Sequence, residues 1–109
     1  MKDHARVVVI GGGVVGCSIL FHLAKMGWKD VVLLERDELT SGSSWHAAGS
    51  FHTVSSDPNV SKLQDYTINL YKEIEETSGH SISLHKTGGF YLASNQSWHD
   101  YLKRERSNA

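Results

Sequence analysis

Short apolar runs alternate with glycine-rich and polar segments in the N-terminal third of the chain. Arg6 to Ile10 contain a continuous β-branched run, which is typical of a strand buried on both faces. A second apolar run extends from Val31 to Leu34. Between the two runs, small and apolar residues recur at helical spacing along one stripe: Gly16, Leu20, Leu23 and Gly27. The pattern predicts a strand, a helix that stops at Gly27, and a second strand.

Three glycines stand directly at the end of the first predicted strand in G-x-G-x-x-G spacing. Gly11 allows a tight turn, Gly13 lets the backbone approach a pyrophosphate, and Gly16 lets the helix pack close to the strand. Val14 and Val15 open that helix, whose free N–H groups and positive dipole end stabilise an anion. We therefore expect these five residues to bind the diphosphate of an adenine dinucleotide.

Glu35 follows the second strand, close to the spacing of about twenty residues at which an acid reaches a ribose hydroxyl. A glycine-rich turn in an ordinary βαβ unit would explain neither that spacing nor the acid. Glu35 disfavours NADP because it would repel the extra phosphate, but it does not separate NAD from FAD. Arg36 is a candidate for the same part of the cofactor, or is solvated or paired.

A cluster of small hydroxyl-bearing residues follows the predicted ribose-binding acid. Ser43 or Ser44 suits a helix cap, and Trp45 to Ala48 could form one short turn that ends at Gly49. Such a turn offers further N–H groups to phosphates or to a flavin ring. A capped turn that holds a half-buried tryptophan is the alternative interpretation.

The remaining pattern predicts a helix, a hairpin and a further helix. Asp57 and Pro58 form a helix start, and Gly79 closes a helix that reaches about Thr77. Its expected buried stripe consists of Leu63, Thr67, Leu70 and Ile74. Two short apolar runs around a glycine pair predict a strand, turn and strand: Ile82 to Leu84, Gly88 and Gly89, and Phe90 to Ala93. Residues 98–106 predict the first turns of another helix.

Composition narrows the function classes. The chain has 109 residues, a net charge of −1 and 39% hydrophobic residues, which argues against nucleic acid or a membrane as the main partner. Cys17 alone allows no internal disulfide, and the histidines show no metal-ligand spacing. The first strand begins so early that we expect no targeting peptide and a cytoplasmic location. Because two parallel strands do not make a complete sheet, we expect the front part of a larger protein, or a small protein completed by a partner chain.

The segments GGGVVGCSILFHLAKMGWKDVVLLER and LTSGSSWHAAG resemble the N-terminal region of the dimethylglycine and sarcosine dehydrogenase family. These are FAD enzymes of the D-amino-acid-oxidase-like superfamily, and the resemblance runs from about Arg6 to beyond Ala93. The glycine fingerprint is shared by many flavoproteins, whereas the W-H-A-A-G element is far more specific. In that family its histidine carries the flavin covalently, and it maps onto His46.

The resemblance implies an α/β fold: a Rossmann-like FAD-binding βαβ unit (residues 1–80 with the helix that follows it), then the start of a substrate-domain β-hairpin (residues 81–109). It implies oxidation of the C–N bond of an N-methylated glycine such as dimethylglycine or sarcosine, by hydride transfer to FAD. The electron acceptor would be oxygen or an electron-transfer flavoprotein. No catalytic residue is recognisable in these residues, so we expect this portion alone to be inactive. Two alternatives remain: an FAD enzyme for another amine or amino acid, and a truncated nucleotide-binding domain without turnover.

Overall fold

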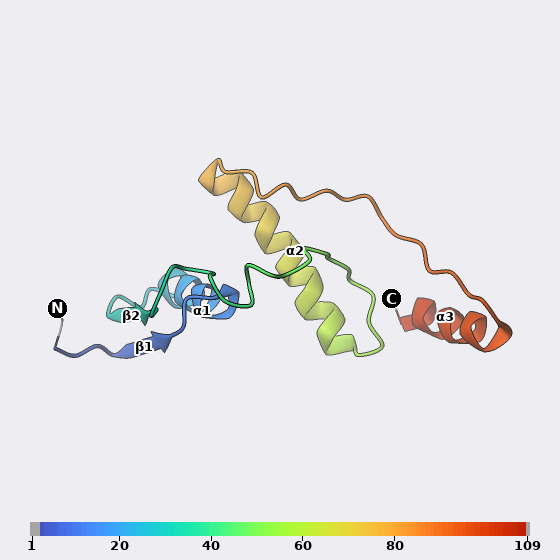
Figure 1. Cartoon of the computed structure of the whole chain (residues 1–109), viewed down its shortest axis with the longest axis horizontal. Helices are drawn as coiled ribbons and strands as arrows, with labels where there is room; N and C mark the ends of the chain where they lie inside the picture. The colour runs from blue at the N-terminus through green and yellow to red at the C-terminus, as the bar shows by residue number, and fades with distance from the viewer. Residues whose placement is uncertain (1–2, 109) are drawn as a thin grey trace. The chain divides into compact units, whose positions relative to one another are not determined.

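The computed structural model describes residues 3–108, which form two compact units that divide between Gly49 and Ser50. The first unit contains β1 (Val7–Ile10), α1 (Val14–Lys25) and β2 (Val31–Leu34). The second contains α2 (Pro58–Ser78) and α3 (Gln96–Asn108) (Figure 1). Each unit is considered separately below.

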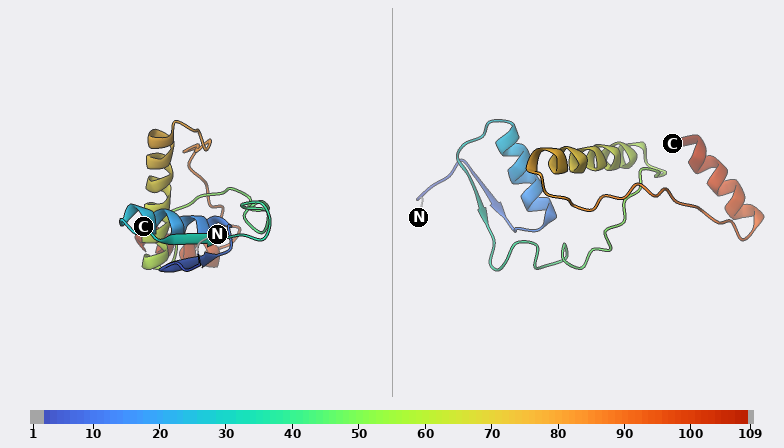
Figure 2. Two further views of the ribbon diagram at one scale, coloured as in Figure 1. Left: turned by 90° about the vertical axis from the view of Figure 1, so that its left-hand side faces the viewer. Right: turned by 90° about the horizontal axis from the view of Figure 1, so that it is seen from above.

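The first unit is the βαβ unit that the sequence predicts. β1 and β2 pair in parallel, with Val7 opposite Val31 and Ile10 opposite Leu34. α1 connects the two strands and packs against both of them (Figure 2). This arrangement brings the end of β1, the start of α1 and the end of β2 to one edge of the sheet, where ligands bind in open α/β folds. The predicted α/β class is confirmed.

Local sequence explains where α1 begins and ends. It starts directly after Gly13, and Gly16 is the residue of the helix that is buried. At its other end Gly27 adopts a φ of +84°, and its N–H donates to the carbonyl of Ala24 at 2.9 Å. The left-handed conformation favours glycine because a side chain there would clash with the backbone. The predicted stop at Gly27 is confirmed.

The burial of β1 differs from the expectation of two covered faces. Val9 is 7% exposed, but Ile10 is 85% exposed and Val8 is also on the surface. α1 packs against one face of the pair, and no other described element of the first unit covers the opposite face. The unbroken apolar run is typical of a strand with two covered faces. In this chain it leaves an exposed apolar sheet face.

α2 has both of the end signals that its sequence predicts. Asp57 is the N-cap, and its carboxylate accepts from the N–H of Asn59 at 2.7 Å and from that of Val60 at 3.3 Å. Gly79 ends the helix with a φ of +70°. The predicted buried stripe holds at Leu70, which is buried, but Leu63 is 64% exposed. The stripe is therefore shorter than the periodicity suggested.

The predicted hairpin is wrong for this structure. Residues 80–93 all lie in the described part of the chain, and none of them is in a strand. Ser81 and Ile82 instead donate hydrogen bonds to the carboxylate of Glu75, and Ser83 has a φ of +57°, so this segment turns at the end of α2. An isolated two-stranded hairpin is at best marginally stable in water.

The last predicted helix is present and longer than expected. α3 spans Gln96–Asn108, and the side-chain oxygen of Asn95 accepts from the N–H of Trp98 at 2.9 Å, as a capping residue does. Among residues 3–108, no helix combines the length and apolar character needed to cross a membrane.

Candidate functional site

The glycine turn between β1 and α1 has the shape that its sequence spacing predicts. Gly11 has a φ of +103°, and its N–H donates to the carbonyl of Leu34 at 2.8 Å, which ties the turn to the end of β2. A Cβ atom at Gly16 would overlap the carbonyl oxygen of Gly11. Close packing of the helix on the strand therefore requires glycine at position 16, whereas the backbone conformation favours glycine at position 11.

Glu35 lies against this turn from the end of β2. Its Oε2 accepts from the N–H of Gly12 at 2.6 Å, and its Oε1 accepts from the N–H groups of Arg36 at 2.7 Å and Asp37 at 3.2 Å. These bonds lower the pKa of the Glu35 carboxyl below its ordinary value, the bond from Gly12 contributing most. A carboxylate at the glycine-lined edge is where the sequence analysis expected the ribose-binding acid.

Gly12 and Thr40 also shape the turn, although the sequence pattern predicts no role for either residue at the site. Gly12 is buried, and a Cβ there would lie 3.1 Å from the Cβ of Glu35. Its carbonyl accepts from the N–H of Thr40 at 2.9 Å, and Thr40 has a φ of +67°. The three consecutive glycines of the sequence were the available signal for Gly12. The G-x-G-x-x-G pattern predicts no role for Gly12, because this residue occupies a position that the pattern leaves variable.

Ser44 caps α1 rather than its own turn. Its Oγ accepts from the N–H of Val14 at 2.8 Å, although the two residues are thirty positions apart in the sequence. A Cβ at Gly13 would lie 3.2 Å from this Oγ, so glycine at that position lets the serine approach. Ser43 is exposed, and its carbonyl accepts from the N–H of His46 at 3.2 Å.

His46 is exposed at the end of the turn that contains Ser44. Its Nδ1 lies 3.1 Å from the carbonyl oxygen of Gly42, and the neighbouring ring of Trp45 contacts it edge-on at 6.1 Å between centroids. Because a carbonyl oxygen can only accept, Nδ1 carries the proton in this hydrogen bond, and in the neutral ring the lone pair is then on Nε2. Trp45 is itself exposed, so the half-buried tryptophan of the alternative interpretation is absent.

The structure brings some of the predicted residues together and leaves others apart. Gly11, Gly13, Gly16, Glu35 and Ser44 converge around the start of α1, through the contacts given above. Two others are exposed at the margin: Val15 in the first helical turn and Arg36, whose backbone N–H rather than its guanidinium contacts Glu35.

This arrangement fits the diphosphate and ribose of a dinucleotide. The amides of Val15 and Gly16 belong to the first turn of α1, where N–H groups have no partner within the helix. The space beside Gly11 is open, since a Cβ there would meet nothing within 4 Å, and Glu35 supplies a hydroxyl acceptor at the same turn. No group of three or more metal-ligating side chains exists among the described residues.

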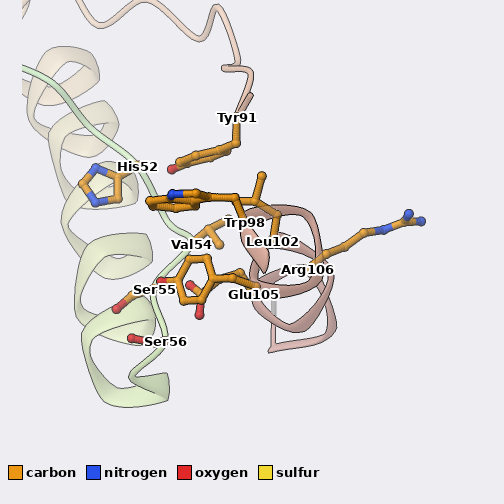
Figure 3. Close-up of a pocket in the computed structure, with 10 residues that line it drawn as sticks. His52, Val54, Ser55, Ser56, Tyr91, Trp98, Leu102, Glu105 and Arg106 are labelled. Atoms are coloured by element: carbon orange, nitrogen blue, oxygen red, sulfur yellow. The ribbon is translucent and has the colours of Figure 1, made fainter. Parts of the chain in front are cut away.

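A separate hollow of about 580 Å³ lies in the second unit (Figure 3). Three aromatic side chains form part of its wall: the rings of Trp98 and Tyr101 meet edge-on at 5.4 Å, and Tyr91 lies nearby. Arg106 points away. None of the residues predicted to bind the cofactor lines this hollow. The residues predicted to bind the cofactor all lie in the first unit.

Comparison with known proteins shows the family of the chain. Residues 6–109 match the DAO family, described as FAD dependent oxidoreductase. The chain is 49% identical over 92 residues to the mitochondrial dimethylglycine dehydrogenase of Homo sapiens. The matched region covers 84% of this chain and 11% of that protein. It is 45% identical over 105 residues to the mitochondrial sarcosine dehydrogenase of Homo sapiens, covering 95% of this chain and 11% of that protein.

A solved structure also resembles the whole chain. The L-proline dehydrogenase from P. horikoshii superposes with a TM-score of 0.89 at 27% sequence identity, covering 99% of this chain and 28% of that one. The chain thus spans about a tenth of the length of the curated relatives named above. It belongs to the DAO family of FAD-dependent oxidoreductases.

Proposed function

We propose that the full-length protein oxidises the C–N bond of an N-methylated glycine, with FAD bound against the first unit and attached to His46. The supporting observation is the convergence of the glycine turn, Glu35 and Ser44 on the start of α1. The similarity to dimethylglycine and sarcosine dehydrogenases supports the substrate class.

In this proposal each group of the first unit has a distinct role. The first-turn amides of α1 at Val15 and Gly16 hold the diphosphate, and Val14, whose N–H donates to Ser44 Oγ, opens the helix beside them. Glu35 accepts hydrogen bonds from the ribose hydroxyls, as a carboxylate that is already ionised. Ser43 and Arg36 lie at the margin of the cofactor, and Ser44 holds the start of α1 through its bond to Val14.

The flavin linkage would use the Nε2 atom of His46. Nδ1 donates to the carbonyl of Gly42, so Nε2 is the ring nitrogen that would form the bond to the flavin. A bond from a ring nitrogen to the 8α carbon of the flavin replaces one C–H bond of the methyl group. The two electrons and two protons released must pass to an oxidant such as dioxygen. The linkage would fix the cofactor in place and make it a stronger oxidant.

Bound FAD supplies the redox chemistry by accepting hydride from the carbon next to the amine nitrogen. Water then hydrolyses the oxidised amine to formaldehyde and the demethylated product. The residues of this chain bind and orient the cofactor, and we name none of them as a catalytic acid or base. We infer that the remaining length of the protein supplies those groups, and that these residues alone are inactive.

Another amine or amino acid is the alternative substrate. The likeness to an L-proline dehydrogenase favours this second candidate, because it covers nearly the whole chain. Both candidates share the FAD site and differ only in the compound that is oxidised.

Anaerobic mixing of the full-length flavoprotein with single substrates tests the proposal. We expect dimethylglycine or sarcosine to bleach the flavin absorbance and to release one formaldehyde per flavin reduced. Glycine betaine is the matched control, because its quaternary nitrogen has no lone pair to assist loss of hydride. Bleaching by L-proline but not by the N-methylated glycines would favour the alternative, and bleaching by none of them would contradict both.

A further inference from the structure

We infer that Ser44 is a positioning residue for His46: its hydroxyl fastens the histidine-bearing turn to the first turn of α1, next to the diphosphate site. This inference rests on the proposed attachment of flavin to His46. It concerns how the chain prepares that attachment, which the glycine fingerprint and the W-H-A-A-G element do not address.

The turn is internally bonded from Thr40 to Ala47. The N–H of Trp45 donates to the carbonyl of Thr40 at 3.0 Å, that of His46 to Ser43 at 3.2 Å, and that of Ala47 to Ser44 at 3.3 Å. With the His46 Nδ1 bond to Gly42, the imidazole is attached to the same network. The ring therefore moves with the turn rather than independently of it.

Two hydrogen bonds join this turn to the glycine loop. One is the backbone bond from Thr40 N–H to the carbonyl of Gly12 at 2.9 Å, at the beginning of the turn. The other is the bond from Val14 N–H to Ser44 Oγ at 2.8 Å, two residues before His46. Ser44 is half-buried, whereas Ser43, Trp45 and His46 are exposed. The Ser44 bond is thus the side-chain attachment nearest to the imidazole.

Gly13 makes this attachment possible. A Cβ there would stand 3.2 Å from Ser44 Oγ, a separation that would force the serine to move. The second glycine of the fingerprint therefore has a role in this chain besides admitting a pyrophosphate. It lets the turn approach α1, so that a hydrogen bond connects the turn that carries His46 to the helix start that forms the proposed diphosphate site.

Loss of the Ser44 hydroxyl should separate two properties that a simple folding defect would reduce together. The amides of Val15 and Gly16 and the carboxylate of Glu35 do not depend on Ser44, so Ser44→Ala should keep most of its affinity for FAD. The rate of covalent attachment should fall by about fivefold to tenfold, the range expected for one lost hydrogen bond. Ser44→Thr keeps a hydroxyl and should recover the rate, and Ser41→Ala is the control within the same turn.

The experiment uses full-length apoprotein expressed without flavin and then mixed with FAD. Total bound FAD is measured by fluorescence titration, and attached FAD by the flavin that precipitates with the protein in acid over time. The inference predicts slow attachment with near-normal affinity in Ser44→Ala, and normal attachment in Ser44→Thr and Ser41→Ala. Attachment in Ser44→Ala at the wild-type rate would overturn the inference alone. A wild-type protein that never retains flavin in acid would reject the His46 linkage, and with it the inference.

Discussion

Gly12 donates its backbone N–H to Oε2 of Glu35 at 2.6 Å, so the acid at the end of β2 is fixed directly to the glycine turn. The other carboxylate oxygen accepts from the N–H groups of Arg36 and Asp37. Both oxygens are therefore used to hold the loop geometry in the free protein. A carboxylate that already lies in place can bind ribose hydroxyls with little further ordering.

Glu35→Gln should weaken FAD binding by about tenfold, because hydrogen bonds to a charged acceptor are roughly twice as strong as neutral ones. Glutamine also replaces one of the two acceptor oxygens by a donor, which would face a backbone N–H. Fluorescence titration of the full-length apoprotein measures the change. Glu38→Gln, an exposed carboxylate on the same connection, should bind FAD like the wild type. Equal affinity in both variants would contradict the role of Glu35.

The pH dependence of stability should report the same contact. The pKa of Glu35 is lower in the folded protein than its ordinary value of 4.5. Folding therefore favours the ionised form, and this stabilisation is complete above that value and lost as the pH falls through the lower folded pKa. The difference in thermal midpoint between the wild type and Glu35→Gln should thus be constant near neutral pH and shrink below a pH of about 4.5. A difference that grows on acidification would contradict this assignment.

Gly16→Ala should destabilise the first unit by about 1–3 kcal/mol and abolish tight FAD binding, because its Cβ would overlap the carbonyl of Gly11. Separation of α1 from β1 is the only relief available to backbone atoms. Gly89→Ala is the control, since a Cβ at that position meets nothing within 4 Å and needs no left-handed backbone. Urea unfolding of both variants provides the comparison, and equal midpoints would show that the close approach is unimportant.

Asp57→Ala should cost about 1 kcal/mol through loss of the N-cap of α2. Asp57→Asn keeps a side-chain oxygen for the N–H of Asn59 and should remain close to the wild type. Hydrogen exchange of the first-turn amides of α2 reads the change locally. Unaltered exchange in Asp57→Ala would mean that the cap does not stabilise this helix.

Features that depend on neighbouring residues could be predicted from the sequence. The stop at Gly27 and the Asp57 cap each involve contacts over a few positions, and the turn at Gly11 follows a fixed glycine spacing. The βαβ unit was also predictable, because its periodicity changes from strand to helix and back within one segment.

Features that depend on distant contacts were not predictable. The bond from Val14 to Ser44 joins residues far apart in the sequence, and any serine in the cluster could have made it. The predicted hairpin is absent, and Ser81 and Ile82 instead donate hydrogen bonds to the carboxylate of Glu75. The strand-like pattern does not reveal this contact. Exposure of Ile10 depends on which elements cover the sheet, and periodicity carries no information about that.

Peptide mass spectrometry of the full-length holoprotein would show whether the flavin is attached to His46. Trypsin should release the peptide from Asp37 to Lys62, which carries His46 and also His52. We expect this peptide to gain the mass of the flavin dinucleotide, and we expect fragmentation to place the added mass on His46. The unmodified mass alone, or flavin located on His52, would contradict it.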